Sequence, residues 1–212
     1  MRFAPESLPI IAPFFGLALL CFVWAAISTS GVATPIGIVC GVLGLALLMF
    51  FRDPARRPPA GEGAVVSPAD GKVMTTEVLL DGRKHISIFL SVFNVHVNRV
   101  PVSGTVQGVN RIPGTYFHAG TARAAGNARV DVEAVSAYGP VAWRQVSGAI
   151  ARKISCLLKR GDTVKTGDRF GLIYFGSRMD VYLPPSAMFR TEPGRKVLAG
   201  ESLIAEFPTK DT

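Results

Sequence analysis

A long apolar stretch without any charged residue lies near the N-terminus, and it constrains this chain more than any other feature. No charge occurs between Glu6 and Arg52, and a Ser-Thr-Ser-Gly turn within the stretch separates two apolar runs, residues 8–27 and 36–51. A membrane-spanning helix needs about 17–25 mostly apolar residues. We therefore expect an N-terminal hydrophobic helical hairpin over residues 1–51 that associates with a membrane.

The basic residues that flank the hairpin predict its orientation. Arg2 precedes the first run, Arg52, Arg56 and Arg57 follow the second, and the connecting turn carries none. The positive-inside rule then places both ends on the cytoplasmic side of the cell (inner) membrane. Because Pro13 interrupts the first run and the second is at the lower limit of spanning length, a re-entrant hairpin stays open beside a spanning one.

The remainder of the chain is basic. The net charge is +8, and residues 52–212 hold 22 of the 23 basic and 14 of the 15 acidic residues. A basic domain next to a membrane segment favours contact with anionic lipid head groups, although a solvated basic surface gives the same composition. No basic stripe interleaved with aromatic residues indicates nucleic acid as a partner. The three cysteines show no metal-site spacing and no disulfide framework, so we expect no metal site.

Beyond the hairpin, the pattern changes to that of a β protein. A Pro- and Gly-rich linker occupies residues 52–63, and no long helical periodicity follows it. Apolar and polar residues alternate with period two in several short runs, which is typical of half-buried strands. The sequence predicts a β-rich domain over residues 64–212. The clearest predicted strands are residues 72–78, 85–90, 129–135 and 141–146.

One segment narrows this β fold further. Residues 158–171 hold two Gly-Asp turns on either side of Val164, a layout similar to that of lipoyl and biotinyl carrier domains. Such carriers present a modified lysine at a hairpin tip, but residues 175–178 read Phe-Gly-Ser-Arg and contain no lysine. We expect a mainly β, barrel-sandwich-hybrid-like domain. A non-catalytic, membrane-tethered carrier or binding module is one hypothesis for its function.

Three separated motifs support an enzyme instead. Residues 67–72 read Ser-Pro-Ala-Asp-Gly-Lys, residues 93–101 read Phe-Asn-Val-His-Val-Asn-Arg-Val-Pro, and residues 175–181 read Phe-Gly-Ser-Arg-Met-Asp-Val. In this order they resemble phosphatidylserine decarboxylase in its short bacterial and archaeal form, over about residues 50–207. The chain has no P-loop, dinucleotide-binding fingerprint, zinc-protease motif or nucleophile elbow, so these motifs carry the hypothesis alone.

The resemblance implies a self-made cofactor. The family cleaves itself at a Gly-Ser bond, here Gly176–Ser177, and turns the serine into a pyruvoyl group. Residues 1–176 and 177–212 would then be two associated fragments. The pyruvoyl group would form a Schiff base with phosphatidylserine, a membrane lipid, and accept the electrons released with CO2, giving phosphatidylethanolamine. A related phosphoserine lipid such as archaetidylserine would undergo the same chemistry, and a homodimer stays open.

The resemblance also implies roles for single residues. Ser177 is the pyruvoyl precursor, Asp70 helps to set up self-cleavage by orienting a base, and His96 transfers protons, which suits an unperturbed imidazole pKa of about 6.5. On their own, Asp70 reads as a turn residue and His96 as an ordinary histidine of an alternating strand. The candidates for substrate binding are Arg99, His118 and Tyr116.

This sequence departs from the family pattern at several positions. Arg99 stands where longer members have a second histidine, and Asn94 stands where some members have an acid. The family's Asn-Glu-Arg triplet reads Asn-Ala-Arg at residues 127–129. The base that activates Ser177 is therefore left open, and His96 is the candidate to serve both self-cleavage and decarboxylation.

Overall fold

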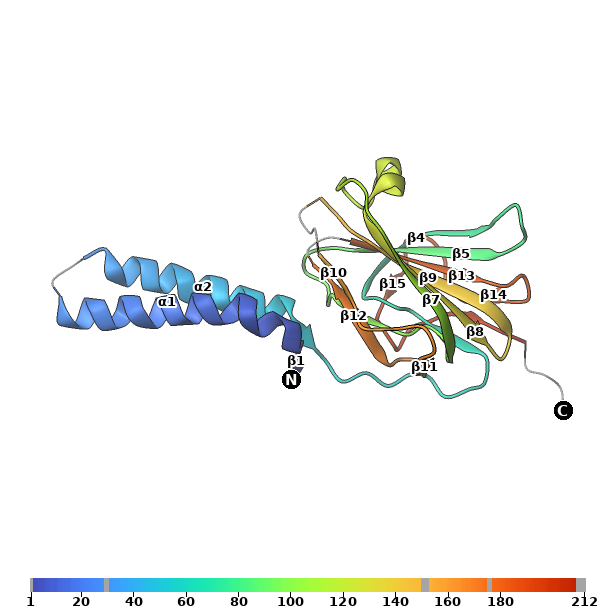
Figure 1. Ribbon diagram of the computed structural model, residues 1–212, viewed down its shortest axis with the longest axis horizontal. Helices are drawn as coiled ribbons and strands as arrows, with labels where there is room; N and C mark the ends of the chain where they lie inside the picture. Colours follow the sequence, from blue (N-terminus) through green and yellow to red (C-terminus); the bar gives the residue numbers. More distant parts are fainter. Residues whose placement is uncertain (1, 29–30, 150–152, 175–176, 209–212) are drawn as a thin grey trace. The chain divides into compact units, whose positions relative to one another are not determined.

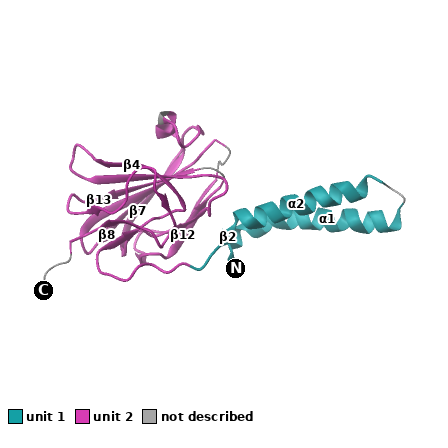
Figure 2. Cartoon of the chain, turned by 180° about the vertical axis from the view of Figure 1, so that it is seen from behind, with its two compact units in different colours: residues 1–55 teal, residues 56–212 magenta. Residues whose placement is uncertain are grey.

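The protein consists of two compact units, which we describe separately. The computed structural model describes residues 2–28, 31–149, 153–174 and 177–208 (Figure 1). The first unit is Met1–Ala55 and the second is Arg56–Thr212 (Figure 2). The first is a two-helix hairpin and the second is a β domain, which confirms the predicted fold class. The elements of the first unit are β1 (Arg2–Phe3), η1 (Pro5–Ser7), α1 (Leu8–Ile27), α2 (Ala33–Phe50) and β2 (Arg52–Asp53).

The hairpin is apolar on all sides. Most large side chains of α1 and α2 point outward and are exposed, which is the pattern of helices surrounded by lipid. Both helices are long and apolar enough to cross a membrane. The helices approach closely where α2 presents glycine, because a Cβ at Gly37 would lie 3.0 Å from the Phe22 ring and one at Gly44 would lie 3.0 Å from the Phe15 ring. The short strands β1 and β2 pair antiparallel, so residues 52 and 53 of the expected linker belong to this unit.

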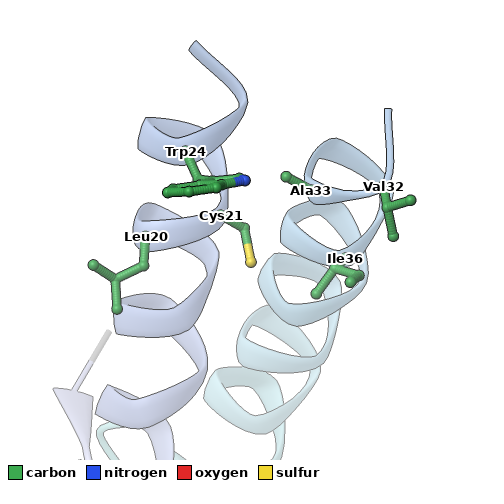
Figure 3. Close-up of a pocket in the computed structure, with 6 residues that line it drawn as sticks. All are labelled: Leu20, Cys21, Trp24, Val32, Ala33 and Ile36. Atoms are coloured by element: carbon green, nitrogen blue, oxygen red, sulfur yellow. The ribbon is translucent and has the colours of Figure 1, made fainter. Parts of the chain in front are cut away.

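The two helices leave a small apolar groove near their connecting turn. Figure 3 shows that Cys21 of α1 and Ala33 of α2 face the gap between the helices, with Trp24 beside them. All of its lining side chains are apolar: Leu20, Cys21, Trp24, Val32, Ala33 and Ile36.

The second unit is built on one large curled sheet (Figure 1). Its eight strands run in the order β11-β7-β8-β9-β13-β5-β4-β15, and each neighbouring pair is antiparallel. The strands are β4 (Gly71–Val78), β5 (Lys84–Leu90), β7 (Gly104–Ile112), β8 (Arg129–Ser136), β9 (Gly139–Val146), β11 (Thr163–Val164), β13 (Ser177–Leu183) and β15 (Lys196–Val197).

Two three-stranded sheets accompany the large one. They have the orders β10-β12-β6 and β14-β16-β3, and both are antiparallel. Their strands are β3 (Ala64–Val66), β6 (Val97–Arg99), β10 (Ile154–Cys156), β12 (Arg169–Ile173), β14 (Met188–Phe189) and β16 (Leu203–Glu206), and a 3-10 helix, η2 (Ala122–Gly126), lies in the β7–β8 connection.

Alternation along the strands separates the core from the outer face of the large sheet. Alternate residues of two central strands belong to one buried apolar cluster, which also contains the fully buried Trp143 of β9. These residues are Ile86, Ile88 and Leu90 of β5 and Met179, Val181 and Leu183 of β13. All four strands that alternation predicts are present as β4, β5, β8 and β9. The two Gly-Asp turns are also present, with Gly161 and Gly167 at φ values of 94° and 84°, a conformation that favours glycine.

Candidate active site

Ser177 occupies a position that is unusual for a serine. It is the first residue of β13, its side chain follows the core-facing row of Met179 and Val181, and it is fully buried. Its Oγ has no hydrogen-bond partner among the residues that the structure describes. A buried hydroxyl without a partner costs free energy, so it calls for a functional explanation. Gly176, the other half of the expected cleavage site, lies outside the described residues.

Strand pairing brings His96 to the same place. Leu90, the last residue of β5, pairs with Ser177, and Val97, the first residue of β6, pairs with Leu172 of β12. The backbone N of Ile173, the last residue of β12, donates to the carbonyl oxygen of His96 at 3.3 Å, so His96 lies at the end of β12 that precedes β13 in the chain. His96, which is fully buried, is the last residue of the connection from β5 to β6.

The His96 ring has a defined tautomer. Its Nδ1 lies 2.9 Å from the carbonyl oxygen of Asn94, and a carbonyl only accepts hydrogen bonds, so Nδ1 carries the proton. In the neutral ring, Nε2 is then the nitrogen that can accept a proton. Asn94 also fixes the loop, because its Oδ1 accepts hydrogen bonds from the backbone N and the Oγ of Ser91 at 2.9 and 2.7 Å.

An interior polar cluster of Asn98, Gln145, Ser147 and Ser177 was not expected from the sequence. Gln145 and Ser147 continue the core-facing row of β9 beyond Trp143, and the pairing of Arg178 with Val146 places Ser147 level with Ser177. Gln145 Nε2 donates to Asn98 Oδ1 at 2.9 Å. Asn98 Nδ2, Gln145 Oε1 and Ser147 Oγ are buried without a partner among the described residues. A polar residue at a core-facing position of an alternating strand is the signal that marks Gln145.

Asp70 lies two strands from Ser177 and makes structural contacts. It directly precedes β4, which pairs with β5, while β13 pairs with the other side of β5. Arg56 donates to both carboxylate oxygens of Asp70, at 2.8 and 3.1 Å, and the backbone N of Ala199 donates to Oδ1 at 2.7 Å. Arg56 also pairs with Glu201 at 2.8 Å, and this hydrogen bond lowers the pKa of the Glu201 carboxyl.

Arg99 lies near Arg56, the arginine that pairs with Asp70. Its guanidinium donates to the carbonyl of Gly167 at 3.1 Å. A Cβ placed on Gly200 would lie 2.7 Å from Arg99 Cδ and 3.6 Å from Arg56 Cβ, so the two arginine side chains flank the same glycine. The structure thus groups Arg99 with the cations around Asp70.

His118 and Tyr116 lie on the connection from β7 to β8, and His118 packs on the outer face of the sheet. Its ring centroid is 5.3 Å from that of Phe89, which points to the face opposite to Leu90 and Ser177. The structure therefore separates His118 from Ser177 by the thickness of the sheet. A groove of about 490 Å³ beside His118 is lined by Lys72, Val73, Met74, Phe89, His118, Gly120, Pro193 and Gly194.

A charged network supports β13 from its outer face. Asp180 has a side chain only 1% exposed, and Arg178 Nε lies 3.0 Å from its Oδ1. His85 of β5 lies between Asp180 and Glu77, with Nδ1 2.7 Å from Glu77 and Nε2 3.7 Å from Asp180. Burial disfavours the charged imidazole, but the nearby carboxylate of Asp180 and the hydrogen bond to Glu77 outweigh it and raise the pKa of His85. Burial likewise opposes ionisation of Asp180, yet His85 and Arg178 keep its pKa lowered.

Fold and site together define a mainly β protein with a buried serine, histidine and amides at one end of a central strand. Comparison with known proteins gives the family. The phosphatidylserine decarboxylase family model matches residues 43–205. The chain is 42% identical to a phosphatidylserine decarboxylase proenzyme of Pelobacter propionicus, over 94% of each chain. It is 40% identical to one of Streptomyces avermitilis, over 96% of this chain and 93% of the relative. This chain belongs to the phosphatidylserine decarboxylase family.

Proposed function

We propose that this protein decarboxylates phosphatidylserine to phosphatidylethanolamine, using a pyruvoyl group that it makes from Ser177. Family membership supports the reaction, and the relatives' name of proenzyme supports self-processing. The observation that carries the assignment of the residue is the fully buried Ser177 Oγ, which has no hydrogen-bond partner among the described residues and starts a central strand beside the connection that bears His96.

Self-cleavage uses the groups already present. Nε2 of His96 takes the hydroxyl proton as Ser177 Oγ attacks the carbonyl carbon of Gly176. The peptide C–N bond breaks, and an ester replaces it. Removal of the Ser177 Cα proton and cleavage of the Cβ–O bond leave a carboxylate on Gly176 and a dehydroalanine at position 177. Addition of one water and loss of ammonia turn the dehydroalanine into the pyruvoyl ketone.

The ketone would supply the electron sink that decarboxylation needs. His96 then has a second duty, because a buried imidazole near that sink can return a proton to the substrate carbon. The interior polar cluster offers Gln145, Asn98 and Ser147 to orient the substrate's polar atoms. We propose that Asp70 has a positioning role. Its pairing with Arg56 fixes the start of β4, the strand that pairs with β5.

The two fragments, residues 1–176 and 177–212, stay associated after cleavage. β13 belongs to the second fragment but lies between β5 and β9 of the first, and β15 and β16 pair with β4 and β3. Separation would break the backbone hydrogen bonds of two sheets. We further propose that the hairpin holds the enzyme at the inner membrane, with the β domain in the cytoplasm, because Arg2 and Arg52 flank its two ends.

The test is a time course of fragment formation together with phosphatidylethanolamine production. Wild-type protein should yield two fragments on a denaturing gel, and Ser177→Ala should remain a single 22.6 kDa chain without activity. Mass spectrometry should find the pyruvoyl cap on the small fragment. Turnover by purified Ser177→Ala would end the proposal, and an uncleaved wild-type chain without turnover would favour a binding module.

Matched histidine variants test the base. His96→Ala should slow cleavage by about 10²–10⁴-fold, the usual effect of losing a general base. His118→Ala, on the other face of the sheet, should cleave at the wild-type rate. Wild-type cleavage in His96→Ala together with slow cleavage in His118→Ala would assign the base to His118. The rates at which the enzyme decarboxylates phosphatidylserine and archaetidylserine show which of the two lipids is the substrate.

A further inference from the structure

The strands around Ser177 end together and define one end of the β domain, which we call the site end. Successive pairings place the ends of five neighbouring strands on one level. The chain leaves the sheet at this level at residues 91, 113 and 147, where the connections 91–96, 113–128 and 147–153 begin. The terminal residues that pair across this end are Leu90, Ser177, Val146, Arg129 and Ile112, with Arg178 as the partner of Val146.

Exposed aromatic side chains gather at the site end. Phe93 is 85% exposed, Phe117 43% and Tyr116 39%, and Val92 beside Phe93 is 38% exposed. Among the described residues of the β domain, these three are the large aromatic side chains that are exposed. We call Val92, Phe93, Tyr116 and Phe117 the aromatic rim. A soluble protein gains nothing from such a group of exposed aromatic side chains at one end of a sheet, so the group indicates an apolar or interfacial partner.

Positive charge accompanies the rim. The guanidinium of Arg123 lies 5.9 Å from the ring centroid of Phe117, and the ammonium of Lys153 lies 5.7 Å from that of Tyr174. The sequence of the three site-end connections contains no Asp or Glu. Aromatic side chains next to cations, without acids, match the head-group region of an anionic lipid leaflet, where aromatic rings lie at the interface and cations meet phosphates.

We propose that the aromatic rim inserts into an anionic leaflet, so that the site end of the β domain faces the lipid surface. Two apolar helices in the same chain are long enough to cross a membrane, which favours a bilayer as the occupant. The inference rests on the proposed lipid substrate, because it gives that lipid a route to the Ser177 end without leaving the membrane. The proposal is independent of how the hairpin is placed.

The test places an indole at the rim of the full-length protein. Phe93→Trp and, as a matched control, Leu80→Trp are made in a Trp24→Phe background and reconstituted into vesicles of anionic phospholipid with brominated acyl chains. Leu80 is fully exposed in the β4–β5 turn, and β5, with its seven residues, separates it from the rim by about 23 Å. Bromine should quench the indole at position 93 at least about twofold more than the one at position 80.

Charge variants and a precursor variant make the outcome specific. Arg123→Gln with Lys153→Gln should at least halve the quenching at position 93, whereas Lys159→Gln with Arg160→Gln, near the opposite end of β7, should not change it. Adding Ser177→Ala to the Phe93→Trp protein should leave the quenching at position 93 unchanged, so failure of the proposed catalysis would not affect this result. Equal quenching at positions 93 and 80 would overturn the proposal. So would a blue-shifted emission at position 93 without quenching, which would indicate a protein partner.

Discussion

Substitution of Asp180 by Asn tests whether the charged network on the outer face holds the strand that carries Ser177. The change keeps the size of the side chain and removes its negative charge. Arg178 then keeps its positive charge with a side chain only 17% exposed, and the His85 imidazole loses one of its two carboxylate neighbours. Desolvated cations without a counter-charge are the costly outcome of breaking a buried ion pair.

The magnitude follows from burial. Removing one partner of a buried pair costs about 3–5 kcal/mol. For a domain of this size, each kcal/mol lowers the unfolding midpoint by about 2–4 °C, so we expect a drop of about 6–20 °C. Asp131→Asn is the matched control, because Asp131 also pairs with an arginine, Arg144 at 2.6 Å, but has a side chain 18% exposed. Partly hydrated pairs contribute about 1 kcal/mol or less, so its drop should stay within about 4 °C.

The assay is thermal unfolding of the full-length protein in detergent, followed by the fluorescence of the buried Trp143 in a Trp24→Phe background. Fragment formation is measured in parallel, because a weakened start of β13 should also slow the cleavage at Ser177. Equal drops in the two variants would refute the reasoning from burial. An unchanged midpoint in Asp180→Asn would show that the network does not stabilise the strand.

Three further predictions concern other contacts. Because the pKa of His85 is raised in the folded protein, its contribution to stability is complete below the unfolded pKa of about 6.5 and is lost as pH rises through the higher folded pKa. The unfolding midpoint of the wild type should therefore fall more steeply above pH 6.5 than that of His85→Gln. Parallel curves of midpoint against pH would contradict this. Gly71→Ala should lower the free energy of unfolding by about 1–3 kcal/mol or more, because its Cβ would lie 2.2 Å from the carbonyl oxygen of Phe89. Gly108→Ala is the control and should be nearly neutral, because its Cβ would have no neighbour closer than 3.7 Å. Equal losses in thermal unfolding would disprove the steric argument. Deleting residues 1–51 should leave a folded β domain by near-ultraviolet circular dichroism. Deleting residues 1–57 should lower its unfolding midpoint by at least about 6 °C, because the deletion removes the Arg56 guanidinium that pairs with the buried Asp70 carboxylate. Identical midpoints would show that Arg56 does not stabilise the domain.

Local patterns predicted the elements of this fold better than they predicted its contacts. Alternation was sufficient for β4, β5, β8 and β9, because a half-buried strand records its burial in every second residue. Arg56 shows the limit: next to an apolar run it was interpreted as a flanking cation, yet it pairs with Asp70 and with Glu201, far along the chain. Such long-range pairs depend on the register of strands, for which a single sequence holds no local signal.

The same limit applies to the candidate site. The motifs identified Ser177 and His96 separately, but only the pairing of β6 with β12 and of β5 with β13 explains why they lie at one place. Gln145 belongs to no matched motif, and Asn98 lies within the second motif but was given no role there. Their contact across 47 positions follows from the tertiary structure alone.

The central place of β13 also sets the order of events during biosynthesis. Translation delivers the hairpin first and then β5 and β9, while the position between these two strands stays empty until the last part of the chain emerges. Ser177 becomes buried only when that final segment closes the sheet. Cleavage would thus report that the ribosome has completed β13, and a chain terminated before β13 could reach the membrane but could never acquire its electrophile.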